Sequence, residues 1–235
     1  MTVGGAPAHK PTRQVSPSEP VLVSGPPPRF VGRGGQKLEG ALAVFDIEPA
    51  GQHCLDAGSS TGGFTDCLVQ EGAASILAVD VGTNQLHEKL RHNSHVDVRE
   101  NTDIRSITPG YLADDTDRAD GFGVIVADLS FISTTSLLPV FAAVLAPGGD
   151  LMVLVKPQFE AGRQEVSKGK GIIRDRDIWV RVLHEFIDSA TAAGLSVQDL
   201  ALSPITGGKG NVEFLAHLAH FPDAQRQFLD GEPTY

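Results

Sequence analysis

The sequence of 235 residues is long enough for one large domain or two small ones. Apolar residues make up 41% and charged residues 20%, so the chain can bury a proper core and is not globally disordered. A net charge of −10 argues against a surface that binds polyanions everywhere, and two cysteines cannot build a disulfide framework.

The first 29 residues differ in composition from the rest of the chain. They hold seven of the fifteen prolines and few large apolar groups, which predicts a disordered tail. A solvated tail is favoured over a docking arm for a partner. The segment lacks the apolar stretch of a secretory signal, and no apolar run approaches the roughly 18–20 residues that span a bilayer. We therefore expect a cytoplasmic protein with a tail over 1–29, a globular domain over 30–221 and a second tail over 222–235.

From residue 30 onward, predicted helices and strands alternate. Leu38, Ala41, Leu42 and Phe45 form one apolar stripe, which predicts a helix over 34–45. Apolar runs and helical periodicity then predict strands over 53–56, 75–80, 96–100, 122–128, 151–156, 195–203 and 212–219, and helices over 62–70, 85–91, 137–145 and 175–193. Residues 147–149 are expected to close a helix, and residues 114–120 to form an acidic loop. The alternation predicts an α/β fold with a seven-stranded, mostly parallel sheet and an antiparallel last strand.

A glycine-rich turn, LDAGSSTGGFTD, follows the first predicted strand. Its spacing matches neither the G-x-G-x-x-G of a dinucleotide site nor a phosphate-cradling loop. Asp56 and Asp66 would repel a pyrophosphate but would suit a ligand with positive charge, such as a sulfonium. The alternative is an ordinary tight turn.

Strand-end acids extend this pattern. Asp80 ends the second strand, where an acid can bind both ribose hydroxyls of an adenosine, and Asp103 could take the adenine amino group. These features favour S-adenosylmethionine over NAD as the cofactor; the alternative is acids that face solvent. The candidate cofactor-binding residues are Asp56, Gly58, Ser59, Ser60, Gly62, Gly63, Phe64, Asp80 and Asp103.

Four further polar residues stand at element ends. Lys37 lies beside the apolar stripe of the first helix, Asp128 and Lys156 end apolar strands, and Glu213 begins the last strand. Open α/β sheets build their sites at the carboxyl ends of strands. Each residue could instead face solvent, although a lysine that closes an apolar strand is costly to bury unless it is paired.

Seven segments resemble the TlyA family, ribosomal RNA ribose 2′-O-methyltransferases with an FtsJ-like catalytic domain, some of which are named haemolysins. The segments are RGGQKLEGAL, LDAGSSTGGFTDCLVQ, AVDVGTNQL, ADLSFIS, LVKPQFE, KGIIRD and GNVEFL, and the match covers residues 30–221. The resemblance implies a Rossmann-like class I methyltransferase fold, S-adenosylmethionine as methyl donor and ribosomal RNA or a ribosomal subunit as partner. It also implies a catalytic tetrad of Lys37, Asp128, Lys156 and Glu213, with Lys156 as the base.

The N-terminal part departs from this family. TlyA proteins usually begin with a small RNA-binding domain, where this chain has the proline-rich segment, and Gly32 stands where the family tends to have serine. Residues 156–176 hold six basic and three acidic residues and several glycines, which predicts a mobile basic loop. The alternative is an ordinary solvated loop. The candidate RNA-binding residues are Arg29, Arg33, Arg163, Lys168, Lys170 and Arg174.

Other functions compete with RNA methylation. The methyl acceptor could be a small hydroxylated molecule, such as a nucleoside or secondary metabolite, which the net charge favours. A membrane-lytic protein and a cofactor-binding protein without catalysis rank lower. No metal site is expected, because the paired histidines lack a third ligand.

Overall fold

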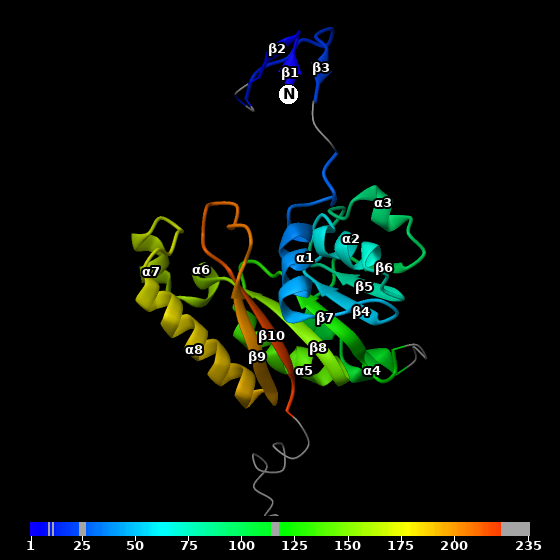
Figure 1. Ribbon diagram of the computed structural model, residues 1–235, viewed down its shortest axis with the longest axis vertical. Helices are drawn as coiled ribbons and strands as arrows, with labels where there is room; N and C mark the ends of the chain where they lie inside the picture. Colours follow the sequence, from blue (N-terminus) through cyan, green and yellow to red (C-terminus); the bar gives the residue numbers. More distant parts are fainter. Residues whose placement is uncertain (9, 11, 24–26, 114–117, 222–235) are drawn as a thin grey trace, which may run out of the picture.

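A seven-stranded sheet forms the centre of the molecule (Figure 1). The computed structural model describes residues 1–8, 10, 12–23, 27–113 and 118–221. The strand order is β6-β5-β4-β7-β8-β10-β9, and β10 is antiparallel to both of its neighbours while the other pairs are parallel. This confirms the predicted fold class. The strands are β4 (His53–Ala57), β5 (Ser75–Val79), β6 (Val96–Arg99), β7 (Phe122–Ala127), β8 (Leu145–Val155), β9 (Leu195–Leu202) and β10 (Phe214–His220).

Helices cover both faces of this sheet. Side chains of α1 and α2 share one apolar core with the sheet, and those of α5 and α8 share the other. The helices are α1 (Gly34–Phe45), α2 (Gly63–Gln70), α3 (Glu88–Arg91), α4 (Pro109–Leu112), α5 (Leu138–Val144), α6 (Pro157–Glu160), α7 (Arg163–Lys168) and α8 (Arg176–Ala192), with 3-10 turns η1 (Ile104–Ser106) and η2 (Thr134–Leu137). In the described part of the chain, none is both long and apolar enough to cross a membrane.

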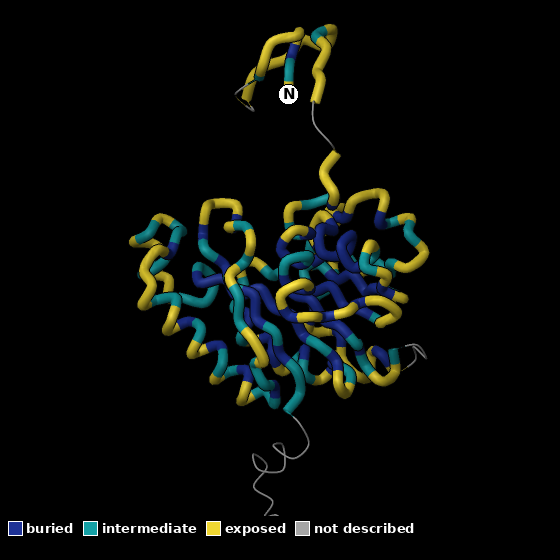
Figure 2. The backbone as a smooth tube through the Cα atoms, in the orientation of Figure 1, coloured by how far each residue is buried: buried dark blue, intermediate teal, exposed yellow. Residues whose placement is uncertain are grey.

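The central strands are apolar on both faces. In β7, Ile125 enters the core beneath α5 and α8, whereas Val124 and Val126 enter the core beneath α1 and α2. Because successive side chains of a strand point to opposite faces, a strand covered on both sides needs an unbroken apolar run. Figure 2 shows the resulting continuous buried interior.

The predicted helix over 85–91 begins later than expected, at Glu88. The Glu100 carboxylate accepts hydrogen bonds from the backbone N–H groups of Asn84, Gln85 and Leu86, at 2.8, 2.7 and 3.1 Å. These bonds hold the first part of the predicted helix as a loop. The helical periodicity was correct only for the last turn.

Two other predictions for loops are wrong in part. Residues 147–149 were expected to form a turn that closes a helix, but they lie within β8. The strand is irregular there: its pairing with β7 shifts between Phe122 and Val124, and Gly148 has a φ of +73°. The basic segment predicted as a loop contains α6 and α7. Proline at the first position favours α6, and the Gly162 N–H donates to the Glu165 carboxylate at 3.1 Å to begin α7.

The N-terminal segment forms a small sheet with the order β2-β1-β3, where a disordered tail was expected. Its strands are β1 (Thr2–Val3), β2 (Ala6–Pro7) and β3 (Val21–Leu22). Val3 is buried, and most of the segment is exposed (Figure 2). The expected C-terminal tail over 222–235 lies outside the described residues, as does part of the acidic loop, 114–117. The division of the chain at residue 29 stays a prediction.

That division predicts that the N-terminal segment contributes little to the stability of the main domain. The hydrogen bonds that the structure gives for residues 1–23 join residues within that segment. Deletion of residues 1–28 should therefore lower the melting temperature by less than about 2–4 °C, the shift that corresponds to roughly 1 kcal/mol in a domain of this size. Calorimetry of the full and shortened chains tests this, and a fall several times larger would mean that the segment packs on the domain.

Candidate active site

Two cavities of about 530 Å³ each lie at the carboxyl ends of the parallel strands. We call the first the tetrad cavity, because Lys37, Asp128, Lys156 and Glu213 line it, and the second the adenosine-side cavity, because Asp80 and Asp103 line it. The two share lining residues: Gly58, Ser60, Asp128, Ser130 and Phe131. They meet beside β4 and β7, the neighbouring central strands where the strand order reverses. This is the position at which open α/β sheets bind ligands.

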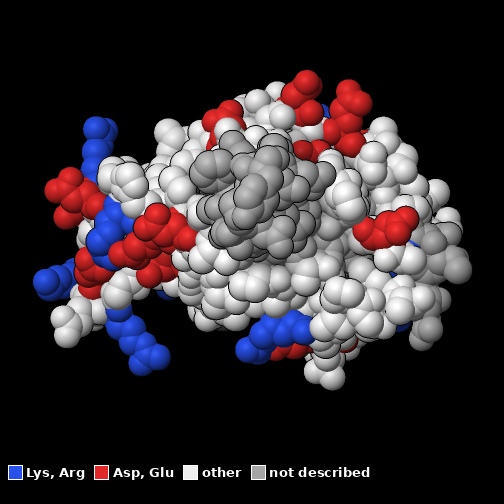
Figure 3. Space-filling model, turned by 90° about the horizontal axis from the view of Figure 1, so that it is seen from below, with Lys and Arg blue, Asp and Glu red and all other residues white. Residues whose placement is uncertain are grey.

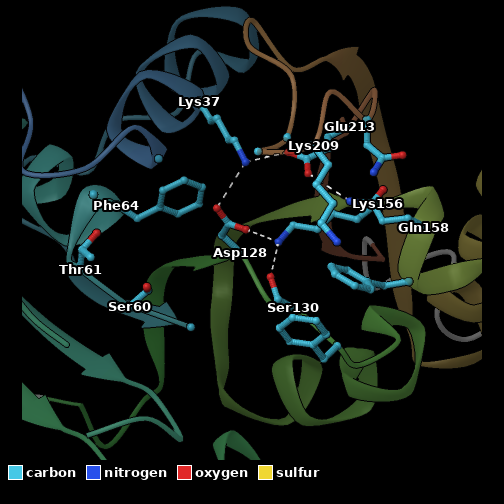
Figure 4. A pocket seen from close by; sticks show the side chains of 18 of the residues that line it. Lys37, Ser60, Thr61, Phe64, Asp128, Ser130, Lys156, Gln158, Lys209 and Glu213 are labelled. Atoms are coloured by element: carbon cyan, nitrogen blue, oxygen red, sulfur yellow. Dashed lines mark hydrogen bonds and ion pairs between the residues drawn. The ribbon is translucent and has the colours of Figure 1, made fainter. Parts of the chain in front are cut away.

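The four predicted catalytic residues converge in the tetrad cavity (Figure 4). Lys37 Nζ lies 2.7 Å from Glu213 Oε2 and 3.6 Å from Asp128 Oδ2, and Lys156 Nζ lies 2.6 Å from Asp128 Oδ1. The result is a chain of alternating charges, Glu213–Lys37–Asp128–Lys156. Four segments far apart in the sequence thus supply one network.

Three members of this network are almost completely buried. Lys37, Lys156 and Glu213 are 8%, 5% and 4% exposed. A buried ammonium or carboxylate costs several kcal/mol unless it is paired and hydrogen-bonded. Lys156 meets that requirement in full, since its three N–H donors face Asp128, the Leu129 carbonyl at 2.7 Å and the Ser130 hydroxyl at 3.0 Å.

Sequence reasoning missed two supports of Glu213. Gln158 Nε2 donates to Glu213 Oε1 at 3.3 Å, while Gln158 Oε1 is buried without a partner in the described part of the chain. A Cβ on Gly207 would lie 2.4 Å from Glu213 Oε1, so a side chain there would displace the carboxylate from its position. The feature of the sequence that could have pointed to Gln158 is its position two residues after Lys156, a predicted catalytic residue.

The glycine-rich turn connects the two cavities. Gly58 has a φ of +86°, and a Cβ there would lie 2.8 Å from the Asp128 carbonyl oxygen. Both features require glycine. Ser59 follows; it is 4% exposed, lines the tetrad cavity, and its hydroxyl has no partner among the described residues.

Asp80 holds the far side of this turn. Its Oδ2 accepts from the Ser60 N–H at 2.8 Å, and its Oδ1 accepts from the Gly82 N–H at 2.7 Å. Each carboxylate oxygen keeps a second lone pair for a ligand. Glu100, which sequence reasoning missed, supports the same wall through the loop that carries Gln85. Hydrogen bonds from Arg91 and from that loop lower the pKa of Glu100 to about 2.

The other predicted cofactor residues divide between the cavity walls and the interior. Gly63 and Phe64 line the tetrad cavity, whereas Gly62 lines neither cavity and precedes α2 as its N-cap. Asp103 lines the adenosine-side cavity, but Arg105 already binds its carboxylate, and hydrogen bonds from Arg105 lower the pKa of Asp103 to about 2. The adenine contact predicted for Asp103 therefore has a competitor within the protein.

Asp56 lies behind the turn and lines neither cavity. It is completely buried, its Oδ2 accepts from the Thr65 hydroxyl at 2.5 Å, and its Oδ1 has no partner among the described residues. Burial is the largest cause that raises the pKa of Asp56; hydrogen bonds from Thr65 oppose it, the negative charges of Asp128 and Asp80 add to it, and the resulting pKa is about 7. Asp66, the second acid of the turn, accepts from the Val31 N–H at 2.9 Å and pairs with Lys89.

The predicted RNA-binding residues lie outside both cavities. Arg29 is held by Glu39 and Glu71, and Arg33 donates to the Thr206 carbonyl at 3.1 Å. The other four make no ion pair with any described residue; they are Arg163, Lys168, Lys170 and Arg174. On the face seen from below in Figure 3, acidic and basic side chains are scattered among uncharged ones. Among the described residues, no group of three or more histidine, cysteine or acidic side chains could hold a metal ion.

The raised pKa of Asp56 predicts a pH-dependent stability. Between its ordinary pKa of 3.8 and the folded value of about 7, the folded state holds a proton that the unfolded state has lost. Stability should therefore fall as the pH rises from about 4 to 7, by on the order of 4 kcal/mol. Asp56→Asn keeps an acceptor for Thr65 and removes the titration. Urea unfolding at several pH values should show wild type losing stability relative to the variant across this range, whereas parallel curves would contradict the assignment.

Comparisons with known proteins relate this chain to methyltransferases. The family model described as FtsJ-like methyltransferase matches residues 30–220. YqxC of Bacillus subtilis, named as a candidate rRNA methyltransferase, is 49% identical over 213 residues, which cover 91% of this chain and 73% of that protein. The 16S/23S rRNA (cytidine-2′-O)-methyltransferase TlyA of Mycobacterium tuberculosis is 40% identical, with 93% and 79% covered. The structure of a candidate hemolysin from Streptococcus thermophilus is 42% identical, with a TM-score of 0.77 and coverage of 89% and 79%.

Proposed function

The chain belongs to the FtsJ-like methyltransferase family, and from this premise we propose that it transfers a methyl group from S-adenosylmethionine to a ribose 2′-hydroxyl of ribosomal RNA. The observation that carries the proposal is the buried Glu213–Lys37–Asp128–Lys156 network beside a second, acid-lined cavity. The names of the similar proteins from Bacillus subtilis and Mycobacterium tuberculosis support the same substrate class.

The residues around the turn fit S-adenosylmethionine. Asp80 would bind the ribose hydroxyls through its free lone pairs, and the Ser59 hydroxyl, which lacks a partner, would bind the amino-acid end. The adenosine-side cavity carries an excess of acids, Asp80, Asp103 and Asp128 against Arg105, and this excess suits a cationic sulfonium better than a pyrophosphate. When bound, this cofactor supplies an electrophilic methyl group, whose bond to sulfur breaks as the bond to oxygen forms.

The chain itself must remove the hydroxyl proton and orient the oxygen. We assign the base to Lys156, whose Nζ would take the proton as the oxygen attacks. An ammonium has no lone pair, so Lys156 must first release one proton to solvent and give up one of its three contacts, those with Asp128, Leu129 and Ser130. Lys37, held by Asp128 and Glu213, would donate to the ribose oxygen and fix its direction.

The substrate would approach over α7 and the segment that follows it. Arg163, Lys168, Lys170 and Arg174 make no ion pair with a described residue, so they can contact phosphates without first breaking one. We take residues 30–221 as the catalytic domain. Because these four basic residues are available for phosphates, we favour RNA as the methyl acceptor over a small hydroxylated molecule, the alternative that the net charge of −10 favours.

Methyl transfer from radiolabelled S-adenosylmethionine tests the proposal. The acceptors are both ribosomal subunits, deproteinised ribosomal RNA and a panel of nucleosides, and labelled RNA is digested to nucleosides to locate the methyl group. Label on a ribose of RNA is expected. If label appears only on free nucleosides, the acceptor is a small molecule and not RNA. If label appears on a base of RNA, the enzyme does not methylate ribose.

The cofactor assignment predicts the effect of a change at Asp80. Asp80→Ala should weaken S-adenosylmethionine binding by about 1–3 kcal/mol, because the ligand hydroxyls lose their acceptor. Titration calorimetry measures this. Asp188→Ala, which removes an exposed carboxylate from α8, controls for the change in charge. Equal affinities of wild type and Asp80→Ala would place the ribose elsewhere.

The assignment of the base predicts that arginine cannot replace Lys156. Lys156→Ala should remove most turnover and leave cofactor affinity within about a few fold, because the lost interaction belongs to the transition state. Lys156→Arg should be nearly as inactive, since a guanidinium stays charged and cannot accept a proton. The rate of methyl transfer at saturating cofactor distinguishes a base from a positioning residue at Lys156. Near-wild-type turnover of Lys156→Arg would make Lys156 a positioning residue.

A further inference from the structure

One lysine in the tetrad cavity has no role in the mechanism above. Lys209 lies in the loop between β9 and β10 and lines the cavity together with the tetrad (Figure 4). It is exposed, and it makes no ion pair or hydrogen bond with any described residue through its side chain. It was not singled out from the sequence.

Lys209 changes the charge of the cavity. The charged residues that line it are three lysines and two carboxylates, so the resting cavity has a net charge of +1. The tetrad alone is neutral, since each of its lysines is matched by a carboxylate. Lys209 therefore supplies an uncompensated positive charge, which attracts an anion to the mouth of the cavity.

The backbone that carries Lys209 is fixed at both ends. Before it, the Thr206 carbonyl accepts from Arg33, which precedes α1. After it, the buried Asn211 side chain donates to the Gly171 carbonyl and accepts from the Ile173 N–H, both at 2.9 Å. The loop is thus held between the start of α1 and the segment that follows α7, while the exposed Lys209 side chain can reach a ligand.

We infer that Lys209 binds a phosphodiester of the RNA next to the ribose that is methylated. The inference rests on the proposed function and narrows it: the site recognises a nucleotide within a chain, because every internal ribose of RNA has a phosphate on each side. A neutral nucleoside offers no anion to this lysine. Arg163, Lys168, Lys170 and Arg174 would bind phosphates farther from the target, because none of them lines the cavity.

Kinetics with an RNA acceptor test this role. Lys209→Gln should raise the KM for RNA about five- to tenfold and reduce the salt dependence of RNA binding by about one counterion. Turnover at saturating RNA should stay within about twofold, because the phosphate contact is the same in the ground and transition states. Affinity for S-adenosylhomocysteine should not change, and Lys209→Arg should behave like wild type.

Lys10→Gln is the matched control. It removes the same charge from the N-terminal segment, which lies apart from the sheet in Figure 1, so it reports any effect of net charge alone. If Lys209→Gln and Lys10→Gln give the same KM and salt dependence while wild type methylates RNA, the inference is wrong and the proposed function stands. If wild type methylates no RNA in this assay, both are overturned.

Discussion

Two lysine ammonium groups are buried at the carboxyl edge of the sheet, and they can remain there only because two carboxylates neutralise them. The direction of the last strand meets this requirement. Phe214 of β10 pairs with Val155 of β8, so the antiparallel direction places Glu213, just before β10, beside Lys156, just after β8. A parallel last strand would begin at the opposite edge and would leave Lys37 with Asp128 alone.

The acids around the glycine turn show how position determines what one side chain can do. Asp56 is buried behind the turn and is disposed to hold a proton, whereas Asp80 stays at the surface of a cavity with two backbone N–H groups on its oxygens. Asp103 is paired with Arg105. Gly58 joins this region to the tetrad, because the missing side chain lets the turn approach the carbonyl of Asp128. The acid-lined cavity and the lysine-containing cavity therefore share a wall and can act on one ligand.

Sequence patterns predicted the sheet and its long helices well, because apolar periodicity follows directly from burial. They failed where a distant side chain decides the backbone: Glu100 lies far along the chain from the loop that it holds, and no local pattern reports that contact. The tetrad came from family resemblance, since spacing alone gave Lys37 and Glu213 equally good reasons to face solvent. Lys209 and Gln158 were missed because their importance depends on which loops meet at the cavity.

The central claim is that a lysine in this network removes the proton of a ribose hydroxyl. The most direct measurement is the single-turnover rate of methyl transfer to RNA as a function of pH, with cofactor and RNA both saturating. We expect a rate that rises with pH and then levels off, because only the uncharged amine of Lys156 can accept the proton. A rate that falls as the lysine loses its proton would mean that the charged ammonium is the active form, and a rate that does not change with pH would mean that no titrating base limits the transfer; either result would contradict the role of Lys156 as the base.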